Sequence, residues 1–214
     1  MAWLLGFIAS DGTIRKDANE IKIGLARRDK EILEKIKEEL KLATNIRDYT
    51  TTDGYDCSTL QWTCAEHKED LAKYNIIPAK TFQLKPPDKL DPKYYIDYIR
   101  GYFDGDGSVN FIKSSNPNHS GALRWQICAA KPEMLEWIME VLYKQYDIPK
   151  VTLRRRKDDA LCYIQYSTNS TKKIHEILYT PNSLCLARKK THFDEIVNDK
   201  ISPRDCISSS VEDK

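Results

Sequence analysis

The sequence WLLGFIASDGTI at residues 3–14 organises the whole chain, because a similar stretch, YIRGYFDGDGSV, returns at residues 98–109. Each copy is an apolar run followed by a glycine, two large apolar residues, a small residue four places after the glycine, and then Asp-Gly. Small residues four positions apart lie on one face of a helix, where another backbone can approach closely. The two stretches therefore predict two helices that pack on each other through their small-residue faces.

Such packing brings two acidic residues, Asp11 and Asp106, together at the same end of the helix pair. Each acid stands one residue before a glycine, Gly12 or Gly107, which we expect to end its helix in a left-handed conformation. Two carboxylates at the negative ends of two helix dipoles repel each other, so one takes up a proton unless positive charge lies between them. The pattern predicts divalent cations at this place.

The stretches LLGFIASDG and IRGYFDGDG resemble the two copies of the LAGLIDADG motif of the homing endonucleases, the second copy more closely. In that family the motif helices form the interface between two similar halves, and the last acidic residue of each motif binds the Mg²⁺ ions that cut DNA. The resemblance implies that Asp11 and Asp106 are the metal ligands and catalytic acids. The first copy departs from the pattern at Ala9, where the second has Asp104, and we interpret Asp104 as a structural residue that caps a neighbouring helix.

Length and composition indicate a globular protein. A chain of 214 residues with 41% hydrophobic residues can bury a sizeable core. Its 34 Lys and Arg nearly balance 32 Asp and Glu, so bulk charge alone does not indicate nucleic acid. Six cysteines without a C-x-x-C or zinc-like spacing favour reduced thiols. With no membrane-length apolar run and no basic region ahead of the apolar start, we expect an unsecreted protein. The resemblance implies a location in the cytoplasm or an organellar matrix, wherever the host intron DNA resides.

The order of predicted elements is the same in both halves: helix, hairpin, helix, hairpin, helix. In the first half we expect strands at residues 13–16, 20–27, 45–51 and 58–63, a helix capped by Asp29, and a helix at 67–74. In the second half we expect a helix opened by Asp91 and Pro92, strands at 109–112, 123–129, 151–156 and 161–167, and helices from Pro132 and at 171–179 and 189–197. Gly6 matches Gly101 and Pro78 matches Pro181, so the repeat is about 100 residues long.

The predicted fold class is therefore α+β, with two pseudo-symmetric LAGLIDADG halves of αββαββα type. Each half is a four-stranded antiparallel sheet with helices on one face, and the motif helices pack at the centre. The predicted boundaries are 1–84 for the first half, 85–91 for a proline-containing linker, 92–197 for the second half, and 198–214 for a polar, disordered tail.

The helix-free faces of the two sheets are predicted to bind double-stranded DNA. Arg and Lys can bind guanine, Gln and Asn can bind adenine, and Tyr or Thr can contact thymine methyl groups or phosphates in the major groove. Residues that we expect on these faces are Arg15, Lys22, Arg27, Arg28, Arg47, Tyr49 and Gln61 in the first half, and Asn110, Lys113, Arg124, Gln126, Arg154, Arg156, Gln165 and Ser167 in the second.

Hydrolysis of a phosphodiester requires an activated water and positive charge on the phosphate, which two carboxylates holding Mg²⁺ or Mn²⁺ can supply. Ca²⁺ is the expected substitute that permits binding without cleavage. Helix ends leave carbonyl groups free, so those of Ser10 and Gly105 are further candidate ligands. The family also places a basic residue near each metal. Our candidates are Lys80 and Lys189, with Lys85, Arg188 and Lys190 as alternatives.

Relatives often have a glutamine at the end of the second strand of each half. Here that region contains Arg27 and Arg28 in one half and Ala129 and Ala130 in the other. This asymmetry leaves open whether the two DNA strands are cut at equal rates.

The resemblance implies a monomeric, intron-encoded homing endonuclease that makes a staggered double-strand break at a long asymmetric site and needs no protein partner. Two alternatives stay open on the same fold, an RNA-splicing maturase and a DNA-binding regulator without cleavage. Two facing carboxylates would not benefit a protein that only binds DNA, which argues against the regulator. The sequence has no RNA-binding motif or long basic arm, although residues 151–157 are basic enough to contribute to RNA binding.

Overall fold

The computed structural model describes residues 1–115, 121–156 and 161–197 of the chain. The tail predicted at residues 198–214 lies outside these ranges, as do residues 116–120 of the loop predicted between two strands of the second half. Among the described residues no helix is long and apolar enough to cross a membrane.

The first sheet has the strand order β1-β2-β4-β3, with antiparallel neighbours throughout. Its strands are β1 (Gly12–Ile14), β2 (Glu20–Ala26), β3 (Arg47–Thr50) and β4 (Asp56–Thr63). Two helices belong to the same half, α2 (Lys30–Glu39) and α3 (Ala65–Lys73). Ile32, Leu33 and Ile36 form the buried stripe of α2, which is the spacing of one helix face.

The second sheet repeats this order as β5-β6-β8-β7, again antiparallel. Its strands are β5 (Gly107–Ile112), β6 (Ala122–Ala129), β7 (Arg154–Arg155) and β8 (Cys162–Tyr166). Its helices are α5 (Pro132–Tyr146), α6 (Thr168–Leu178) and α7 (Ala187–Val197). Burial alternates residue by residue along β6, as it does in a strand with one face on the core. The α+β fold with two four-stranded antiparallel sheets is confirmed.

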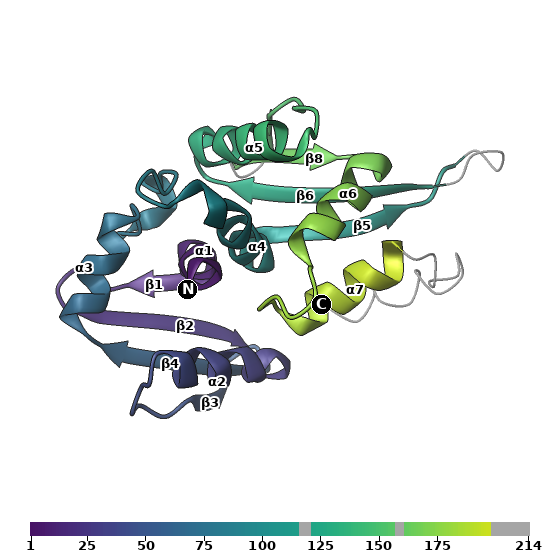
Figure 1. Ribbon diagram of the computed structural model, residues 1–214. Helices are drawn as coiled ribbons and strands as arrows, with labels where there is room; N and C mark the ends of the chain where they lie inside the picture. Colours follow the sequence, from purple (N-terminus) through teal and green to yellow (C-terminus); the bar gives the residue numbers. More distant parts are fainter. Residues whose placement is uncertain (116–120, 157–160, 198–214) are drawn as a thin grey trace.

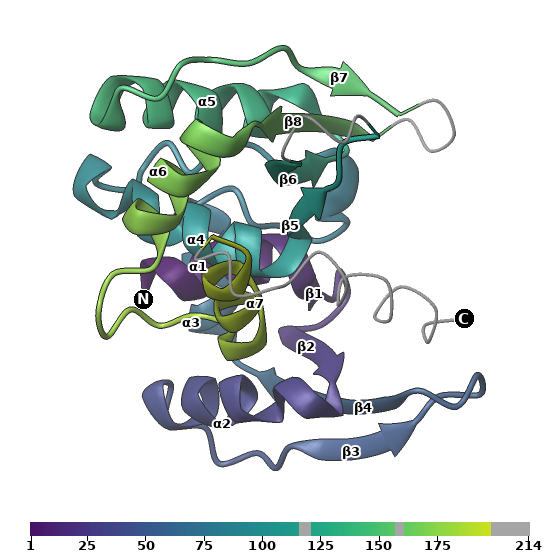
Figure 2. The same cartoon turned by 90° about the vertical axis from the view of Figure 1, so that its right-hand side faces the viewer.

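The helices α1 (Ala2–Asp11) and α4 (Tyr95–Asp106) pack on each other between the two sheets (Figure 1). A Cβ atom added at Gly6 would lie 2.0 Å from the Tyr98 carbonyl oxygen, and one added at Gly101 would lie 1.9 Å from the Trp3 carbonyl oxygen. Each glycine therefore admits the backbone of the other helix, as the repeated motif predicts. The helix α7 lies beside this pair, between the two sheets, in both Figure 1 and Figure 2.

The prediction of left-handed glycines after the two acids is wrong. Gly12 has φ −74° and ψ 150°, and Gly107 has φ −91° and ψ 159°, so each is the extended first residue of a strand. Both are glycines for a steric reason instead. A Cβ atom at Gly12 would lie 2.6 Å from the Ile8 side chain, and one at Gly107 would lie 1.9 Å from the Phe103 ring. The chain turns directly from motif helix into sheet because no side chain blocks it.

Two other local predictions need correction, whereas one is confirmed. Asp29 precedes α2, but within the described structure its side chain makes no capping hydrogen bond, because an ion pair with another helix holds it. The strand predicted at residues 151–156 shortens to the two residues of β7. Asp91 does cap: its side chain accepts a hydrogen bond from the Lys93 amide at 3.1 Å, where a 3-10 helix (Pro92–Tyr94) leads into α4.

Candidate metal and DNA site

The two motif acids meet at the C-terminal end of the α1–α4 pair. Gly105 makes room for them, since a Cβ atom there would lie 2.0 Å from the Ser10 hydroxyl oxygen and 3.1 Å from the carboxyl carbon of Asp11. Because β1 and β5 begin directly after Asp11 and Asp106, the pair of acids adjoins both sheets.

Burial disfavours the charged form of both acids. Desolvation raises the pKa of Asp11 to about 6, and the nearby Asp106 carboxyl group adds to the increase. Desolvation also raises the pKa of Asp106, although Lys80, Lys189 and a hydrogen bond from the Tyr102 hydroxyl oppose this. The positive charge of the two lysines therefore does not fully offset burial at these acids.

Lys80 and Lys189 reach equivalent places in the two halves. The Lys80 ammonium donates to the carbonyl oxygens of Ala9 at 2.8 Å and Ser10 at 2.6 Å, at the end of α1. The Lys189 ammonium donates to those of Phe103 at 2.9 Å, Gly105 at 3.1 Å and Gly107 at 2.7 Å, at the end of α4. Cations at helix C-termini are favoured by the helix dipole and by the free carbonyls there.

Both lysines are also partly desolvated. Burial lowers the pKa of Lys189 to about 8 and lowers that of Lys80, while the nearby carboxylates oppose the change in each case. Three carbonyl acceptors around Lys189 match the three donors of an ammonium group, so the contacts favour its protonated form.

The electrostatic pairing of lysines and acids crosses between the halves. Of the two ammonium groups, Lys189 lowers the pKa of Asp11 more strongly than Lys80 does, whereas Lys80 lowers the pKa of Asp106 more strongly than Lys189 does. Each motif helix thus has its end carbonyls bound by the lysine of its own half, but its acid is accompanied mainly by the lysine of the other. Lys80 and Asp106 also line one cavity together, and we call each such acid–lysine set a composite site.

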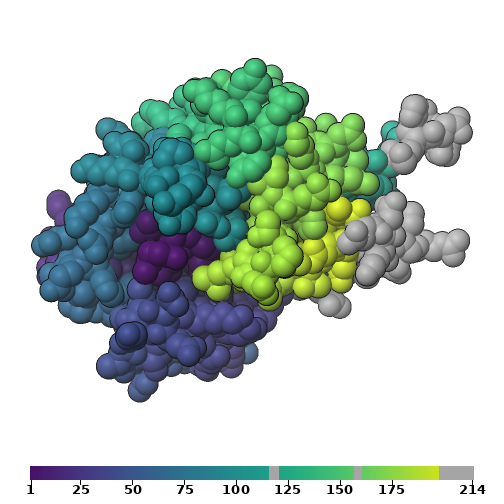
Figure 3. Space-filling view, in the orientation of Figure 1, coloured from purple at the N-terminus to yellow at the C-terminus, as the bar shows by residue number. Residues whose placement is uncertain are grey.

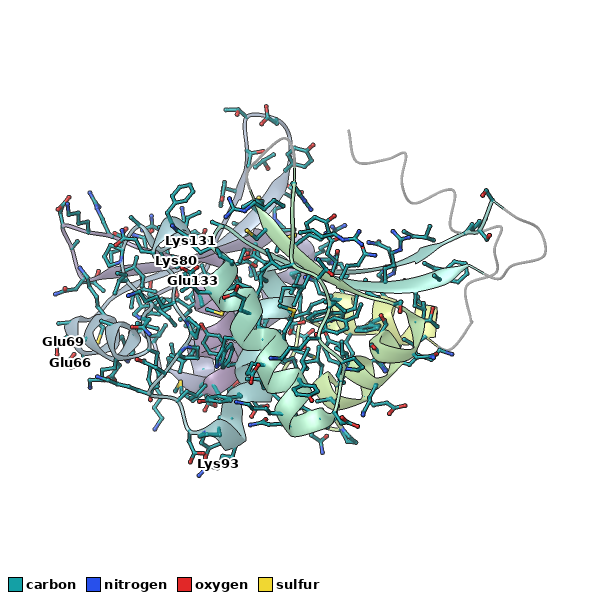
Figure 4. All side chains as sticks on the ribbon, turned by 90° about the horizontal axis from the view of Figure 1, so that it is seen from above. Glu66, Glu69, Lys80, Lys93, Lys131 and Glu133 are labelled. Atoms are coloured by element: carbon teal, nitrogen blue, oxygen red, sulfur yellow. The ribbon has the colours of Figure 1, made fainter. Side chains whose placement is uncertain are left out.

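One of these composite sites opens into a cavity of about 210 Å³. Its lining includes Ser10 and Lys80 from the first half and Tyr102, Asp106, Cys128 and Lys131 from the second. Lys80 and Lys131 lie near each other in Figure 4, and both line this cavity. A cavity with one carboxylate and two lysines has the charges to receive a phosphate beside a cation.

Asp104 is a structural residue in this fold, and it does cap a neighbouring helix. It is 1% exposed, and its carboxylate accepts hydrogen bonds from the Trp3 indole at 2.8 Å, the Tyr179 hydroxyl at 2.8 Å and the Leu186 amide at 2.9 Å. Leu186 directly precedes α7. The first motif has Ala9 at the matching position and receives no such helix, which explains the difference between the two motif copies.

The alternative basic candidates have other partners or lie elsewhere. Arg188 forms an ion pair with Asp29 at 3.1 Å, and Lys190 forms one with Asp194 at 2.5 Å. Lys85 is not among the residues that line the cavity beside Asp106. The structure thus brings Lys80 and Lys189 to the acids in preference to the three alternatives.

The donor set around the acids suits a hard divalent cation. It consists of two carboxylates and the carbonyl oxygens of Ser10 and Gly105, all oxygen ligands of the kind that Mg²⁺ and Ca²⁺ prefer. A carbonyl oxygen has two lone pairs, so contact with a lysine leaves one for a cation. Within the described residues no group of three or more His, Cys, Asp and Glu side chains gathers. A cation here would therefore complete its shell with water or substrate oxygens, as Mg²⁺ commonly does.

Strand register places most of the predicted DNA-binding residues on the helix-free faces. Pairings such as Lys22 with Gln61 and Gln126 with Gln165 put alternate positions on one face, opposite the buried isoleucines and leucines. Residues placed there are Arg15, Lys22, Arg47, Tyr49 and Gln61 on the first sheet, and Asn110, Arg124, Gln126, Arg154, Arg156 and Gln165 on the second.

The other four predicted residues stand at strand ends. Arg27 is tied to its own sheet, because its guanidinium lies 3.2 Å from the Asp56 carboxylate and donates to the Tyr49 carbonyl at 3.3 Å. Arg28 and Lys113 are exposed just beyond β2 and β5, and Ser167 precedes α6. Contacts within the sheets also reduce the free charge, since the Arg15 guanidinium lies 3.8 Å from the Glu20 carboxylate.

Sequence reasoning missed two residues of the site. Lys131 lines the cavity from the position before α5, and Tyr102 contacts Asp106 from one turn earlier on α4, where the first motif has Phe7. The sequence does contain a signal for Tyr102, because the aligned first motif has Phe7 there and the added hydroxyl marks a difference. The Lys131 position depends on how the end of β6 folds over the site, which no local pattern indicates.

Comparisons with known proteins agree with this fold. Residues 1–73 match the family model of the LAGLIDADG-like domain, and no curated protein sequence matches the chain. The solved structure of the LAGLIDADG meganuclease I-AabMI bound to uncleaved DNA is similar at a TM-score of 0.57 and 16% identity, over 92% of this chain and 90% of that one. The I-LtrWI homing endonuclease bound to target DNA is similar at 0.57 and 13%, over 95% and 93%.

A different protein shares the fold. Full-length DUF199/WhiA from Thermatoga maritima is similar at a TM-score of 0.55 and 19% identity, over 94% of this chain and 60% of that one. Likeness at these identities shows the fold alone.

The resemblance to the LAGLIDADG proteins is confirmed. Residues 1–73 match the LAGLIDADG-like domain, and the two halves together share the fold of the LAGLIDADG endonuclease structures.

Proposed function

We propose that this protein is a site-specific, metal-dependent DNA endonuclease that cuts both strands of a long asymmetric duplex as a monomer. The observation that carries the proposal is the pair of facing acids, Asp11 and Asp106, each accompanied by a partly buried lysine at the end of a paired motif helix. A protein that only binds DNA has no use for two carboxylates that repel phosphate.

In each composite site the carboxylate and the lysine have different roles. Asp11 and Asp106, with the carbonyls of Ser10 and Gly105, would hold Mg²⁺ or Mn²⁺, and Ca²⁺ would bind without supporting cleavage. A divalent cation bound there would activate water and neutralise charge on the phosphate. Lys80 and Lys189 supply a further positive charge against the phosphate, and their carbonyl contacts fix where that charge stands.

The free sheet faces provide the DNA-binding surface in this proposal. Arg, Lys, Gln, Asn and Tyr side chains stand there at alternate strand positions, which is how a β-ribbon presents side chains to the major groove. The two faces differ in sequence, so the target should be non-palindromic. The I-LtrWI structure, with its target DNA bound, supports duplex DNA as the partner.

The test compares Asp11→Asn and Asp106→Asn with the unchanged protein on a cleavable duplex. Each variant should lose double-strand cleavage in Mg²⁺ while binding the duplex in Ca²⁺ with an affinity within a few-fold of the original. Asp70→Asn, which changes an exposed acid on α3, serves as the control and should cut normally. Full cleavage by either motif variant would refute the assignment of the two acids.

A further inference from the structure

The helix α7 holds Lys189 in the site, and its N-terminal end is fastened by residues of both halves. From α4, the Asp104 carboxylate accepts the Leu186 amide at 2.9 Å, and the Arg100 guanidinium donates to the Leu184 carbonyl at 2.9 Å. The third contact comes from the first half, where Asp29 forms an ion pair with Arg188.

The Asp29–Arg188 pair joins residues 159 positions apart. The Arg188 Nε atom lies 3.2 and 3.3 Å from the two carboxylate oxygens of Asp29, and one terminal nitrogen lies 3.1 Å from the second oxygen. The Asp29 side chain is only 6% exposed, against 47% for Arg188. A buried carboxylate is costly unless it is paired, so Asp29 requires the guanidinium of α7.

Figure 3 shows the segment that leads into α7 lying against the surface of the N-terminal half. Arg188 and Lys189 are consecutive on this helix, so their side chains point about 100° apart around its axis. With Arg188 held by Asp29, the rotation and depth of α7 are fixed. Lys189 then reaches the carbonyls at the end of α4, where its charge lowers the pKa of Asp11.

We propose that Asp29 and Arg188 are positioning residues that hold Lys189 in the composite site with Asp11. The proposal rests on the proposed nuclease function and adds that this site depends on an ion pair between the halves. The Lys80 site does not share this dependence, because Lys80 enters through a 3-10 helix (Lys80–Phe82) of its own half. Loss of the pair should therefore impair one of the two sites selectively.

The experiment uses Asp29→Asn, Arg188→Gln and the double variant in the full chain. The control is Lys30→Gln, which breaks the Lys30–Asp48 ion pair of 2.8 Å at the same end of α2 but within one half. The first readout is acetylation of lysine side chains by a small acylating reagent, measured by mass spectrometry. The second is the rate at which each DNA strand is cut, with the strands labelled separately.

We expect Lys189 to be acetylated several times faster in all three variants, with Lys80 and the Lys30→Gln control unchanged. One strand should be cut roughly 10- to 100-fold more slowly, because small displacements of a catalytic group have effects of that size. The other strand and DNA binding in Ca²⁺ should change less than twofold. The double variant should cut no worse than either single variant, although Arg188→Gln should lower thermal stability most, since it leaves a buried carboxylate unpaired.

Unchanged acetylation of Lys189 would overturn the proposal, as would equal slowing of both strands in proportion to lost stability. If the unchanged protein cuts no duplex, the proposed nuclease function fails, but the acetylation readout still decides whether the pair positions Lys189.

Discussion

At the scale of single residues, two carboxylates define the candidate site and lower the stability of the folded protein. Asp11 and Asp106 stand at the ends of two packed helices, where burial raises the pKa of each above its ordinary value and repulsion from Asp106 adds to the increase at Asp11. A cation in contact with the carboxylates would lower both pKa values. The folded chain provides two lysines nearby, and both are tied to backbone carbonyls instead of the carboxylates. The remaining negative charge is what a divalent cation would neutralise.

Replacement of Asp11 by Asn should stabilise the metal-free protein near pH 7–8. The pKa of Asp11 is about 6 in the folded state and 3.8 when unperturbed, so the folded form holds its proton more tightly. The stability of the unchanged protein therefore falls as pH rises from about 4 to about 6, whereas Asn does not titrate. We expect a gain of about 1–2 kcal/mol at neutral pH after allowance for solvent access to this half-buried group.

Thermal unfolding of both proteins in EDTA at pH 4, 6 and 8 measures this gain. The two melting temperatures should converge at pH 4. A variant that is less stable at pH 8 would show that the carboxylate is already neutralised by the lysines.

Substitution of each lysine should slow cleavage of a different DNA strand. Because Lys80 accompanies Asp106 and Lys189 accompanies Asp11, Lys80→Gln should slow one strand and Lys189→Gln the other. Removal of one preorganised charge at a reacting phosphate typically costs about 100- to 1,000-fold in rate. Strand-specific labelling measures this, and equal slowing of both strands by both variants would contradict the crossed arrangement.

At the scale of elements, the paired motif helices place the acids and connect directly to the sheets. Their closeness depends on glycines whose missing side chains leave room for backbone. At Gly101 an added Cβ would lie 1.9 Å from the Trp3 carbonyl oxygen, whereas at Gly24 the nearest atom, the Thr59 hydroxyl oxygen, would lie 3.2 Å away. The helix interface therefore has no space for even one methyl group.

The substitution Gly101→Ala should destabilise the protein by about 3 kcal/mol or more, because neither backbone can move without separating the helices. For a chain of this size that corresponds to roughly 6–12 °C in melting temperature. Gly24→Ala is the control and should change stability by less than about 1 kcal/mol, since a side chain in a strand offsets a mild contact. Thermal unfolding measures both, and equal small effects would refute close packing at the motif.

The features that could be predicted from sequence are those set by residues close together in the chain. The motif pair, the repeated order of elements and the alternating strand faces follow from short patterns, and the approach of Lys80 and Lys189 to the helix ends follows from the repeat. The ion pair of Asp29 with Arg188 could not be predicted, because it joins residues far apart in the sequence. The sequence indicated a helix cap for Asp29 and an alternative basic site residue for Arg188. The extended conformation of Gly12 likewise depends on the Ile8 side chain beside it.

At the scale of the whole molecule, two similar halves make one non-symmetric surface. The helix-free faces present different side chains, and the second half has in addition α7 and the buried Asp104 that caps it. The formal net charge is only +2, so attraction to DNA must come from the arrangement of these faces. The repeat thus provides two sites of similar geometry that differ in their supporting contacts.

Affinity for duplex DNA should fall steeply as salt rises. Basic residues spread over two sheets would displace several counterions from the phosphates, and each contact adds about −0.9 to the slope of log affinity against log salt. Six or more contacts predict a loss of roughly 1,000-fold or more between 50 and 200 mM salt. Titration in Ca²⁺ with a fluorescent duplex measures the slope. A flat response would rule out an extended phosphate interface.

The most direct test of the nuclease proposal is a selection on a randomised duplex library, incubated with the protein in Mg²⁺ and separately in Ca²⁺. Sequencing of the cut and the bound molecules should give one long asymmetric site, cut on both strands in Mg²⁺ and bound without cleavage in Ca²⁺. A library that is bound but never cut in either ion would contradict the account and make the chain a nucleic-acid-binding protein on a nuclease fold.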